Sequence, residues 1–234
     1  ATRNATEDQL FKVALKRLNT LVEHGATTVE IKSGYGLDLD TELRMLTVAD
    51  RLSKTLPVCI SPTFLGAHTF PPEYRDNHDG YVDLLINTML PEVKNQGIAH
   101  AVDAFCESIA FSYDQTKSIL ERAVELGFNI KLHAEQLSDS SGSQLAAELG
   151  ALSCDHLEYL SQDGAKAMAE NNVTAVLLPG AFYYLKETRK PPIRLFRERN
   201  IPMAVSTDLN PGSSPVYSMP LVLNMSCMLF GLTV

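Results

Sequence analysis

Short apolar runs recur along the chain and alternate with segments whose hydrophobic residues repeat at helical spacing. The runs are rich in Val, Ile, Leu, Phe and Cys and show little strict alternation of apolar and polar residues, which is typical of strands covered on both faces of a parallel sheet. They predict seven strands, at Thr28–Ile31, Val58–Leu65, Ala101–Cys106, Asn129–Ala134, Leu152–Leu157, Thr174–Leu178 and Pro202–Ser206.

The segments between these strands carry helix-end signals. Thr6 with Gln9 and Ser112 with Gln115 each form the pattern of a capping box. Gly25 and Gly127 follow at the expected ends of those two helices. Shorter helices are predicted at Gln144–Leu149, Asp163–Glu170 and Ile193–Arg199, and a last one begins after an N-cap at Ser214, with Pro215 in its first turn.

The seven strand–helix repeats follow one another without a low-complexity linker, so we expect one domain over residues 1–234. They predict an α/β fold, a TIM-like (β/α) barrel that lacks one unit. The alternative is an open doubly wound sheet, which is disfavoured because no G-x-G-x-x-G follows the first strand. Polar residues gather at the strand ends, where barrel enzymes carry their chemistry: Lys32, His68, Glu107, His133, Asp155, His156 and Asp208.

Composition and charge narrow the class of protein. The formal net charge of −8 is not typical of proteins that bind nucleic acid or an anionic membrane surface. The longest apolar stretch, 216–230, contains Pro220 and Asn224 and is shorter than the roughly 20 residues that span a bilayer. The four cysteines form no C-x-x-C pair, and the chain opens on ATRNATEDQL without an apolar signal segment. We therefore expect buried free thiols and a cytoplasmic protein.

Three strand-end residues are candidate metal ligands. Taken singly, His133 and His156 are more typical of packed or hydrogen-bonded core histidines, and Asp208 is typical of a residue that caps a turn. Together they place two imidazoles and a carboxylate on consecutive strand ends of one sheet. Imidazole nitrogen and carboxylate oxygen are suitable ligands for Zn or Fe.

Other polar groups at the same strand ends allow two interpretations each. Tyr35, in K-S-G-Y-G, belongs either to a flexible surface turn or to a loop that aims its hydroxyl at a ligand. His68 follows small residues that leave room for a ligand, whereas Gln136 is also an ordinary residue for a helix start. The segment 210–214, N-P-G-S-S, is either a simple turn or a loop whose N–H groups bind a carboxylate.

Seven motifs taken together resemble the imidazolonepropionase family of the amidohydrolase superfamily, and the resemblance runs over essentially the whole chain. The S-G-Y-G and L-N-P-G loops narrow the resemblance to this family. The motifs are E-I-K-S-G-Y-G-L, T-F-L-G-A-H, D-A-F-C-E, K-L-H-A-E-Q-L-S, G-A-L-S-C-D-H-L-E-Y-L, L-L-P-G-A-F-Y-Y-L and S-T-D-L-N-P-G-S-S-P.

The resemblance implies an amidohydrolase-type (β/α)₈ barrel that hydrolyses the cyclic amide of 4-imidazolone-5-propanoate to N-formimidoyl-L-glutamate, with one Zn or Fe ion and a possible homodimer. It implies metal ligands at His133 and Asp208, and catalytic roles for Asp208, His68 and His156. It implies substrate contacts at the following positions: Tyr35, His68, Gln136, Asn210, Gly212 and Ser213.

One departure from the family pattern is large. The family's first barrel strand carries an H-x-H pair that completes the metal site, and this sequence contains no H-x-H. We therefore expect an internal piece of a longer protein, with seven of eight barrel units and without the flanking β-sandwich domain. Two rival interpretations stay open: another amidohydrolase, such as a deaminase or a dihydroorotase-like enzyme, and a catalytically inactive barrel fragment.

Overall fold

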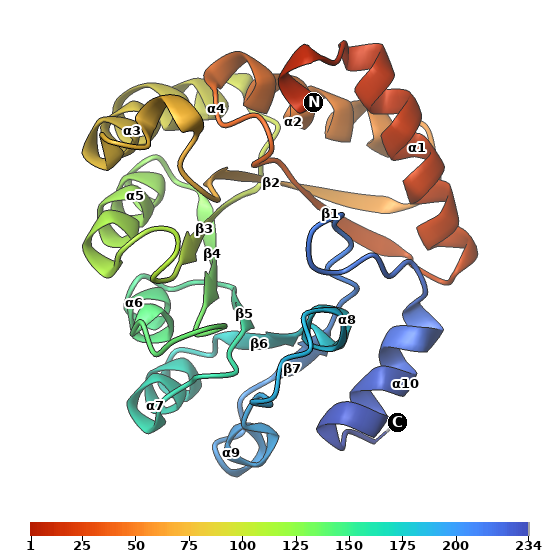
Figure 1. Ribbon diagram of the computed structural model, residues 1–234, viewed down its shortest axis with the longest axis vertical. Coiled ribbons are helices and arrows are strands. Elements are labelled where there is room, and N and C mark those ends of the chain that lie inside the picture. The colour runs from red at the N-terminus through yellow and green to blue at the C-terminus, as the bar shows by residue number, and fades with distance from the viewer. Residues whose placement is uncertain (234) are drawn as a thin grey trace.

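A computed structural model describes residues 1–233 and contains one sheet of seven parallel strands (Figure 1). Each strand pairs with the next one along the chain, in the order β1 to β7. The strands are β1 Thr28–Lys32, β2 Cys59–Ala67, β3 Ala101–Cys106, β4 Asn129–Ala134, β5 Ser153–His156, β6 Thr174–Leu177 and β7 Met203–Val205. All seven predicted strands are confirmed, with differences only at their ends.

Most of the helices lie on the outside of the curved sheet, whereas α8 lies inside this ring, beside β6 and β7 (Figure 1). The helices are α1 Glu7–Glu23, α2 Leu39–Ser53, α3 His78–Leu84, α4 Leu90–Gln96, α5 Tyr113–Glu125, α6 Gly142–Glu148, α7 Gln162–Glu170, α8 Pro179–Tyr184, α9 Ile193–Glu198 and α10 Met219–Phe230. Both predicted capping boxes are present, at the start of α1 and at the start of α5. These boxes satisfy backbone N–H groups that the first helical turn leaves without partners.

The strand order decides between the two predicted architectures. A doubly wound sheet reverses its strand order at a switch point, whereas this sheet advances strand by strand around a centre (Figure 1). The main hydrophobic core fills the space between the outer helices and the sheet, and includes Phe64, Tyr81, Phe111 and Phe196. The barrel interpretation is therefore confirmed, and its strand ends converge on one side.

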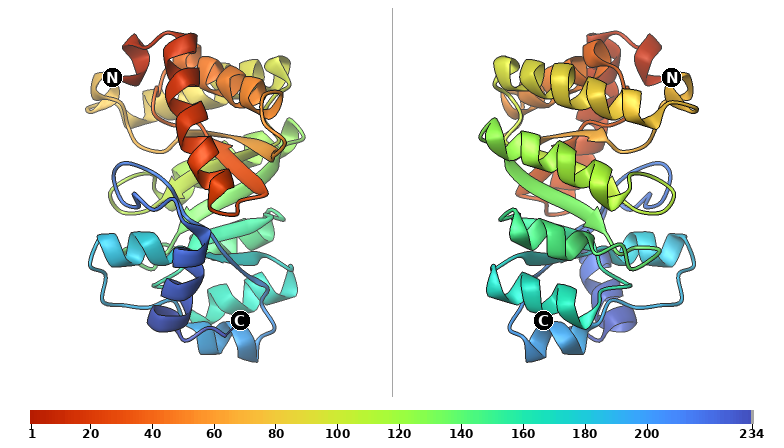
Figure 2. Two further views of the ribbon diagram at one scale, coloured as in Figure 1. Left: turned by 90° about the vertical axis from the view of Figure 1, so that its right-hand side faces the viewer. Right: turned by 90° about the vertical axis from the view of Figure 1, so that its left-hand side faces the viewer.

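The sheet has two edges among the described residues, because β1 pairs only with β2 and β7 only with β6. Helices α1 and α10 lie one above the other on this side of the molecule (Figure 2, left). Unpaired edges offer N–H and C=O groups to another strand.

Two expectations were wrong. The helix predicted to follow Ser214 begins at Met219, with Ser218 as its N-cap. The Ser214 hydroxyl instead donates to the Thr207 carbonyl at 2.6 Å. Of the four free cysteines, Cys106 and Cys154 are buried as expected, whereas Cys59 is exposed at the start of β2 and Cys227 on α10 is half-buried. Within residues 1–233, no helix combines the length and hydrophobicity that crossing a membrane requires.

Candidate functional site

A cavity of about 1450 Å³ extends along the open side of the barrel to the carboxyl ends of the strands. Its wall includes β1, parts of α1 and the loop that follows β7. All nine residues singled out from the sequence line it: Tyr35, His68, His133, Gln136, His156, Asp208, Asn210, Gly212 and Ser213. The fold thus brings together residues that are up to 178 positions apart, taking Tyr35 and Ser213 as the extremes.

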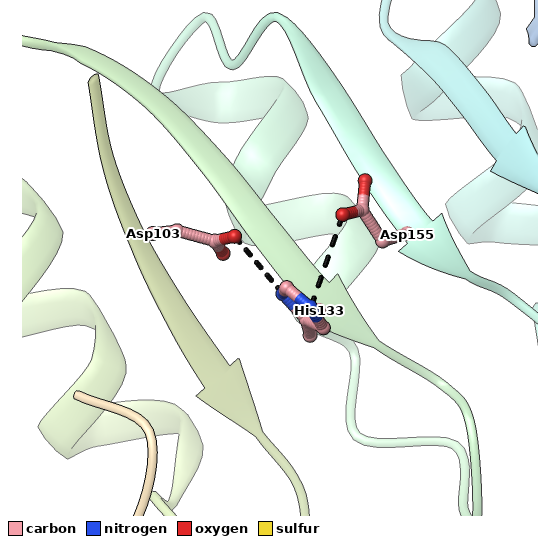
Figure 3. Close-up of side chains that lie close together, drawn as sticks. All are labelled: Asp103, His133 and Asp155. Atoms are coloured by element: carbon pink, nitrogen blue, oxygen red, sulfur yellow. Dashed lines mark ion pairs between the residues drawn. The ribbon is translucent and has the colours of Figure 1, made fainter. Parts of the chain in front are cut away.

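His133 lies near the end of β4 between two carboxylates from the neighbouring strands (Figure 3). Its Nδ1 is 3.0 Å from Oδ2 of Asp103 on β3, and its Nε2 is 3.9 Å from Oδ2 of Asp155 on β5. One ligand atom from each of the three residues lies within 4.8 Å of the others. Burial alone would lower the pKa of His133, but the two carboxylates outweigh it and raise the pKa to about 9.

Lys32 supplies a positive charge to the same group. Its Nζ is 2.5 Å from Oδ2 of Asp103, 3.4 Å from Oδ2 of Asp155 and 3.2 Å from Oε2 of Glu30. Burial would raise the pKa of Asp103, but His133 and Lys32 more than reverse this and hold it well below its usual range. The interior of the sheet therefore carries ionised carboxylates that are paired with cations.

Two further histidines border the cavity and are held in the neutral form. Burial lowers the pKa of His156, whose ring centroid is 5.5 Å from that of His133. Burial also lowers the pKa of His68, whose Nδ1 is 2.9 Å from the Gly34 carbonyl oxygen. Each imidazole is therefore favoured in its neutral form, which can donate a hydrogen bond from one ring nitrogen and accept one at the other.

Asp208 follows β7 and lines the cavity, but it is not one of the three residues clustered around His133. Burial raises its pKa to about 6, although the nearby His133 opposes the shift. Its φ of 48° is left-handed, as are those of Glu135 at 52° and His156 at 81°. Non-glycine residues in this region are strained and are concentrated at functional sites.

The loop after β1, which carries Tyr35, is held by a buried carboxylate. Glu42, on α2, accepts hydrogen bonds from the backbone N–H groups of Gly34 at 2.7 Å, Gly36 at 2.8 Å and Leu37 at 2.9 Å. A Cβ atom at Gly34 would lie 2.6 Å from the Leu65 carbonyl oxygen, and φ there is 98°. This loop, residues 33–37, therefore depends on glycine and on a distant side chain.

The loop after β7 is held by its own asparagine. Asn210 Oδ1 accepts hydrogen bonds from the N–H groups of Gly212 at 2.9 Å and Ser213 at 2.7 Å, and Asn210 Nδ2 donates to the Asp208 carbonyl at 2.8 Å. The N–H groups predicted to bind a carboxylate therefore already have a partner within the loop, residues 208–214. Asn210 Nδ2 also lies 3.2 Å from Asp208 Oδ2, so the loop orients that carboxylate.

Gln136 follows β4 on a turn that two buried glutamates fix. Glu107, at the end of β3, accepts hydrogen bonds from the Leu137 N–H at 2.9 Å and the Ser138 hydroxyl at 2.6 Å. Glu135 accepts from the Ser143 N–H at 3.0 Å, and burial raises its pKa to about 7. Gln136 itself is buried and borders the cavity.

Known proteins of similar sequence agree with the family resemblance of the motifs. The chain is 58% identical over 233 residues to the imidazolonepropionases of Shewanella sp. (strain W3-18-1) and Shewanella baltica (strain OS195). The matches cover 100% of the chain and 57% of each relative, so the chain spans little more than half of their length. The resemblance to imidazolonepropionases is confirmed. No family model matches the chain.

Solved structures support the fold. An adenine deaminase from Arthrobacter aurescens superposes with a TM-score of 0.74 at 14% identity, over 97% of this chain and 70% of that one. An adenosine deaminase from Xanthomonas campestris with bound zinc gives 0.68 at 14% identity, over 97% and 52%. At this identity the likeness concerns the fold alone, which is the amidohydrolase-type barrel expected from the imidazolonepropionase-like motifs.

The residues around His133 fit a metal ion of the kind that the imidazolonepropionase resemblance implies. Nitrogen and carboxylate oxygen are the donors that Zn and Fe take, and the buried Nδ1 of His156 has no hydrogen-bond partner. Sequence reasoning missed Asp103 as part of this group. The motif D-A-F-C-E contains it, but its partners Lys32 and His133 come from other strands, so no local spacing marks it.

Proposed function

We propose that the protein containing this chain is a metal-dependent imidazolonepropionase, which opens the ring of 4-imidazolone-5-propanoate to N-formimidoyl-L-glutamate. The observation that carries the proposal is the convergence of all nine expected residues on one cavity, in a chain 58% identical to imidazolonepropionases. The 234 residues form one barrel domain with seven of the eight units, and the missing ligands belong to the unit between β7 and β1.

Nε2 of His133 and the Asp208 carboxylate are the groups proposed to hold one Zn or Fe ion. Both line the cavity at strand ends, and Nδ1 of His133 is already turned to Asp103. When bound, such an ion lowers the pKa of a water ligand and polarises the substrate carbonyl. The sequence supplies no further family ligand, because it contains no H-x-H.

Asp208 is proposed as the general base. Its carboxylate takes the proton of the attacking water and passes it to the ring nitrogen that leaves when the amide bond breaks. The neutral imidazoles of His68 and His156 face the same cavity and can donate a hydrogen bond to the oxygen that becomes negative. Asn210 orients the Asp208 carboxylate from the side.

Tyr35, Gln136 and the loop 208–214 are proposed to form the walls that hold the ring and the propanoate arm. Tyr35 is 44% exposed, with its ring 5.4 Å from that of His68. Its hydroxyl is therefore free to meet a ligand. Gly212 and Ser213 contribute shape and the Ser213 hydroxyl, because their N–H groups bind Asn210.

The test of this function is Asp208→Asn in the full-length protein. Asparagine keeps the shape of the side chain but cannot accept a proton, so turnover of 4-imidazolone-5-propanoate should fall by about a thousandfold or more. Asp163→Asn on α7 is the matched control, because Asp163 is exposed and does not line the cavity. Turnover of Asp208→Asn within tenfold of wild type, with an unchanged melting temperature, would contradict the assignment.

A substrate panel separates the rival amidohydrolases. Wild-type enzyme is offered 4-imidazolone-5-propanoate, adenine, guanine and dihydroorotate, and product is followed by absorbance. Ring opening of the imidazolone alone is expected. Deamination of a purine, or hydrolysis of dihydroorotate at a comparable kcat/KM, would replace the proposed substrate. The isolated 234-residue chain is expected to be inactive, which its assay beside the full-length protein checks.

A further inference from the structure

The charged groups between β1, β3, β4 and β5 include more than the expected metal ligand. Lys32, Asp103, His133 and Asp155 come from four strands, and their charged atoms form one connected group. Asp103 is fully buried and its Oδ2 contacts both Lys32 Nζ, at 2.5 Å, and His133 Nδ1, at 3.0 Å. The proposed reaction assigns no role of their own to Lys32 and Asp103.

The two nitrogens of His133 lie in different surroundings. Nδ1 faces a carboxylate that is fixed in place by an ammonium group, whereas Nε2 faces the more open side, 3.9 Å from Asp155. In metalloproteins, an imidazole that binds metal through one nitrogen usually gives the other N–H to a carboxylate or carbonyl, which fixes its tautomer and ring orientation. Asp103 Oδ2 is the carboxylate oxygen that contacts Nδ1 of His133, at 3.0 Å, and this nitrogen has no other partner among residues 1–233.

The same three residues could instead be a metal site themselves, since their ligand atoms lie within 4.8 Å of one another. Lys32 opposes that use. Its ammonium lies 2.5 Å from Asp103 and 3.4 Å from Asp155, so it already occupies the place of a cation between the two carboxylates. A divalent ion bound there would be repelled by the neighbouring positive charge at short range in a buried setting.

We propose that Asp103 is a positioning residue that orients His133 through Nδ1, and that Lys32 keeps Asp103 and Asp155 from coordinating a metal ion themselves. The proposal rests on the proposed function, because it takes Nε2 of His133 to be a metal ligand. It adds two residues to the site that the expected ligand set does not contain. It also predicts that the site holds one metal ion because a lysine takes the place of a second.

The test measures Zn²⁺ binding to the full-length protein by competition with a chromophoric chelator, for wild type, Asp103→Asn and Asp155→Asn. Asp103→Asn should retain one equivalent of Zn²⁺ with about 10–100-fold weaker affinity, which is the usual effect of losing such an outer partner. Asp155→Asn is the comparison, because it removes the carboxylate on the Nε2 side of His133 and leaves Asp103 beside Nδ1, so its loss of affinity should be smaller. Co²⁺ spectra should shift for Asp103→Asn alone.

Lys32→Met tests the second half of the proposal. Without the ammonium, the two carboxylates and His133 are open to a cation, so this variant should bind a second equivalent of Zn²⁺ and gain melting temperature when zinc is added. A stoichiometry that stays at one would overturn the role of Lys32. The readout is the gain on adding zinc, so it holds even where the zinc-free variant is unstable.

Removing one partner of a buried ion pair can unfold a protein, so the double variant Lys32→Met with Asp103→Asn is the folding control. It removes both charges together and should fold, while its affinity for Zn²⁺ stays as weak as that of Asp103→Asn. Wild-type affinity in the double variant or in Asp103→Asn would overturn the role of Asp103, and so would an equal loss in Asp155→Asn. Wild type that binds neither Zn²⁺ nor Fe²⁺ would overturn the proposed function as well.

Discussion

Two loops of the cavity are held in opposite ways. The loop after β1, residues 33–37, receives its hydrogen bonds from outside: three go to Glu42 on α2, and Arg3 donates to the Gly36 carbonyl at 2.6 Å. The loop after β7, residues 208–214, is held largely by Asn210 within it. One loop therefore depends on tertiary structure, and the other on a turn that a short peptide could form.

The two loops should therefore respond differently to the loss of the side chain that holds them. A change at Glu42 removes an acceptor from three backbone donors at once and leaves them buried, so its cost should appear in global stability. A change at Asn210 releases groups near the surface of a local turn, where water can replace the lost partner. Five substitutions in and around the cavity follow, from the largest expected effect to the smallest.

Glu42→Ala should give the largest effect on folding. Glu42 is fully buried and accepts three N–H groups, so alanine should lower the free energy of unfolding by roughly 3 kcal/mol or more. Urea denaturation followed by circular dichroism measures it. Asp40→Ala, an exposed acidic position in the first turn of α2, is the matched control. A loss below 1 kcal/mol would show that loop 33–37 is not tied to the core in this way.

Asn210→Ala should cost less stability, about 1–2 kcal/mol, because it breaks a local turn. Its larger effect should be on activity, since Asn210 Nδ2 lies 3.2 Å from Asp208 Oδ2. Steady-state kinetics and denaturation on the same preparation separate the two effects. Should Asn210→Ala unfold as easily as Glu42→Ala, the contrast between the loops would fail.

Tyr35→Phe and Gln136→Ala should weaken substrate binding without loss of metal. A hydrogen bond to a bound polar group contributes roughly 0.5–3 kcal/mol, which corresponds to a several-fold to about hundredfold loss in kcat/KM. Metal analysis of the purified variants accompanies the kinetics. Loss of stoichiometric metal from either variant would mean that the residue supports the metal group instead of the substrate wall.

Arg3→Ala should give the smallest effect. Its side chain is 38% exposed and forms ion pairs with Asp38 at 3.0 Å and Glu73 at 2.7 Å. Exposed pairs of this kind contribute about 0–1 kcal/mol and weaken with salt. Thermal melts at low and high ionic strength measure the effect. A loss that persists in high salt would show that the hydrogen bond to Gly36, and not the ion pairs, is what matters.

The fold was predictable from sequence because each strand is a compact apolar run whose neighbours along the chain are also its neighbours in space. The helix predicted after Ser214 was misplaced for a tertiary reason. The Ser214 hydroxyl bonds to the Thr207 carbonyl and its backbone pairs with Asn210, so the chain continues to Ser218 before α10 begins. A capping signal alone does not reveal such a competing partner.

The site was predictable to the extent that its residues lie at strand ends. His133 and Asp208 both do, and both line the cavity. Asp103 lies within β3 instead, and its closest charged partner, Lys32, is 71 residues away. A single acidic residue in an apolar run does not indicate which strand its side chain will contact. The position of Asp103 beside His133 is therefore evident only in the structure.

The left-handed backbone at Glu135, His156 and Asp208 has a consequence for engineering. Each such residue costs roughly 1–3 kcal/mol relative to a relaxed conformation, and glycine would relieve that strain. A library screened for heat resistance alone would therefore be enriched in glycine at these three positions. Two of these positions are proposed to act on the substrate. The most heat-resistant variants would therefore be the ones that had lost catalytic residues.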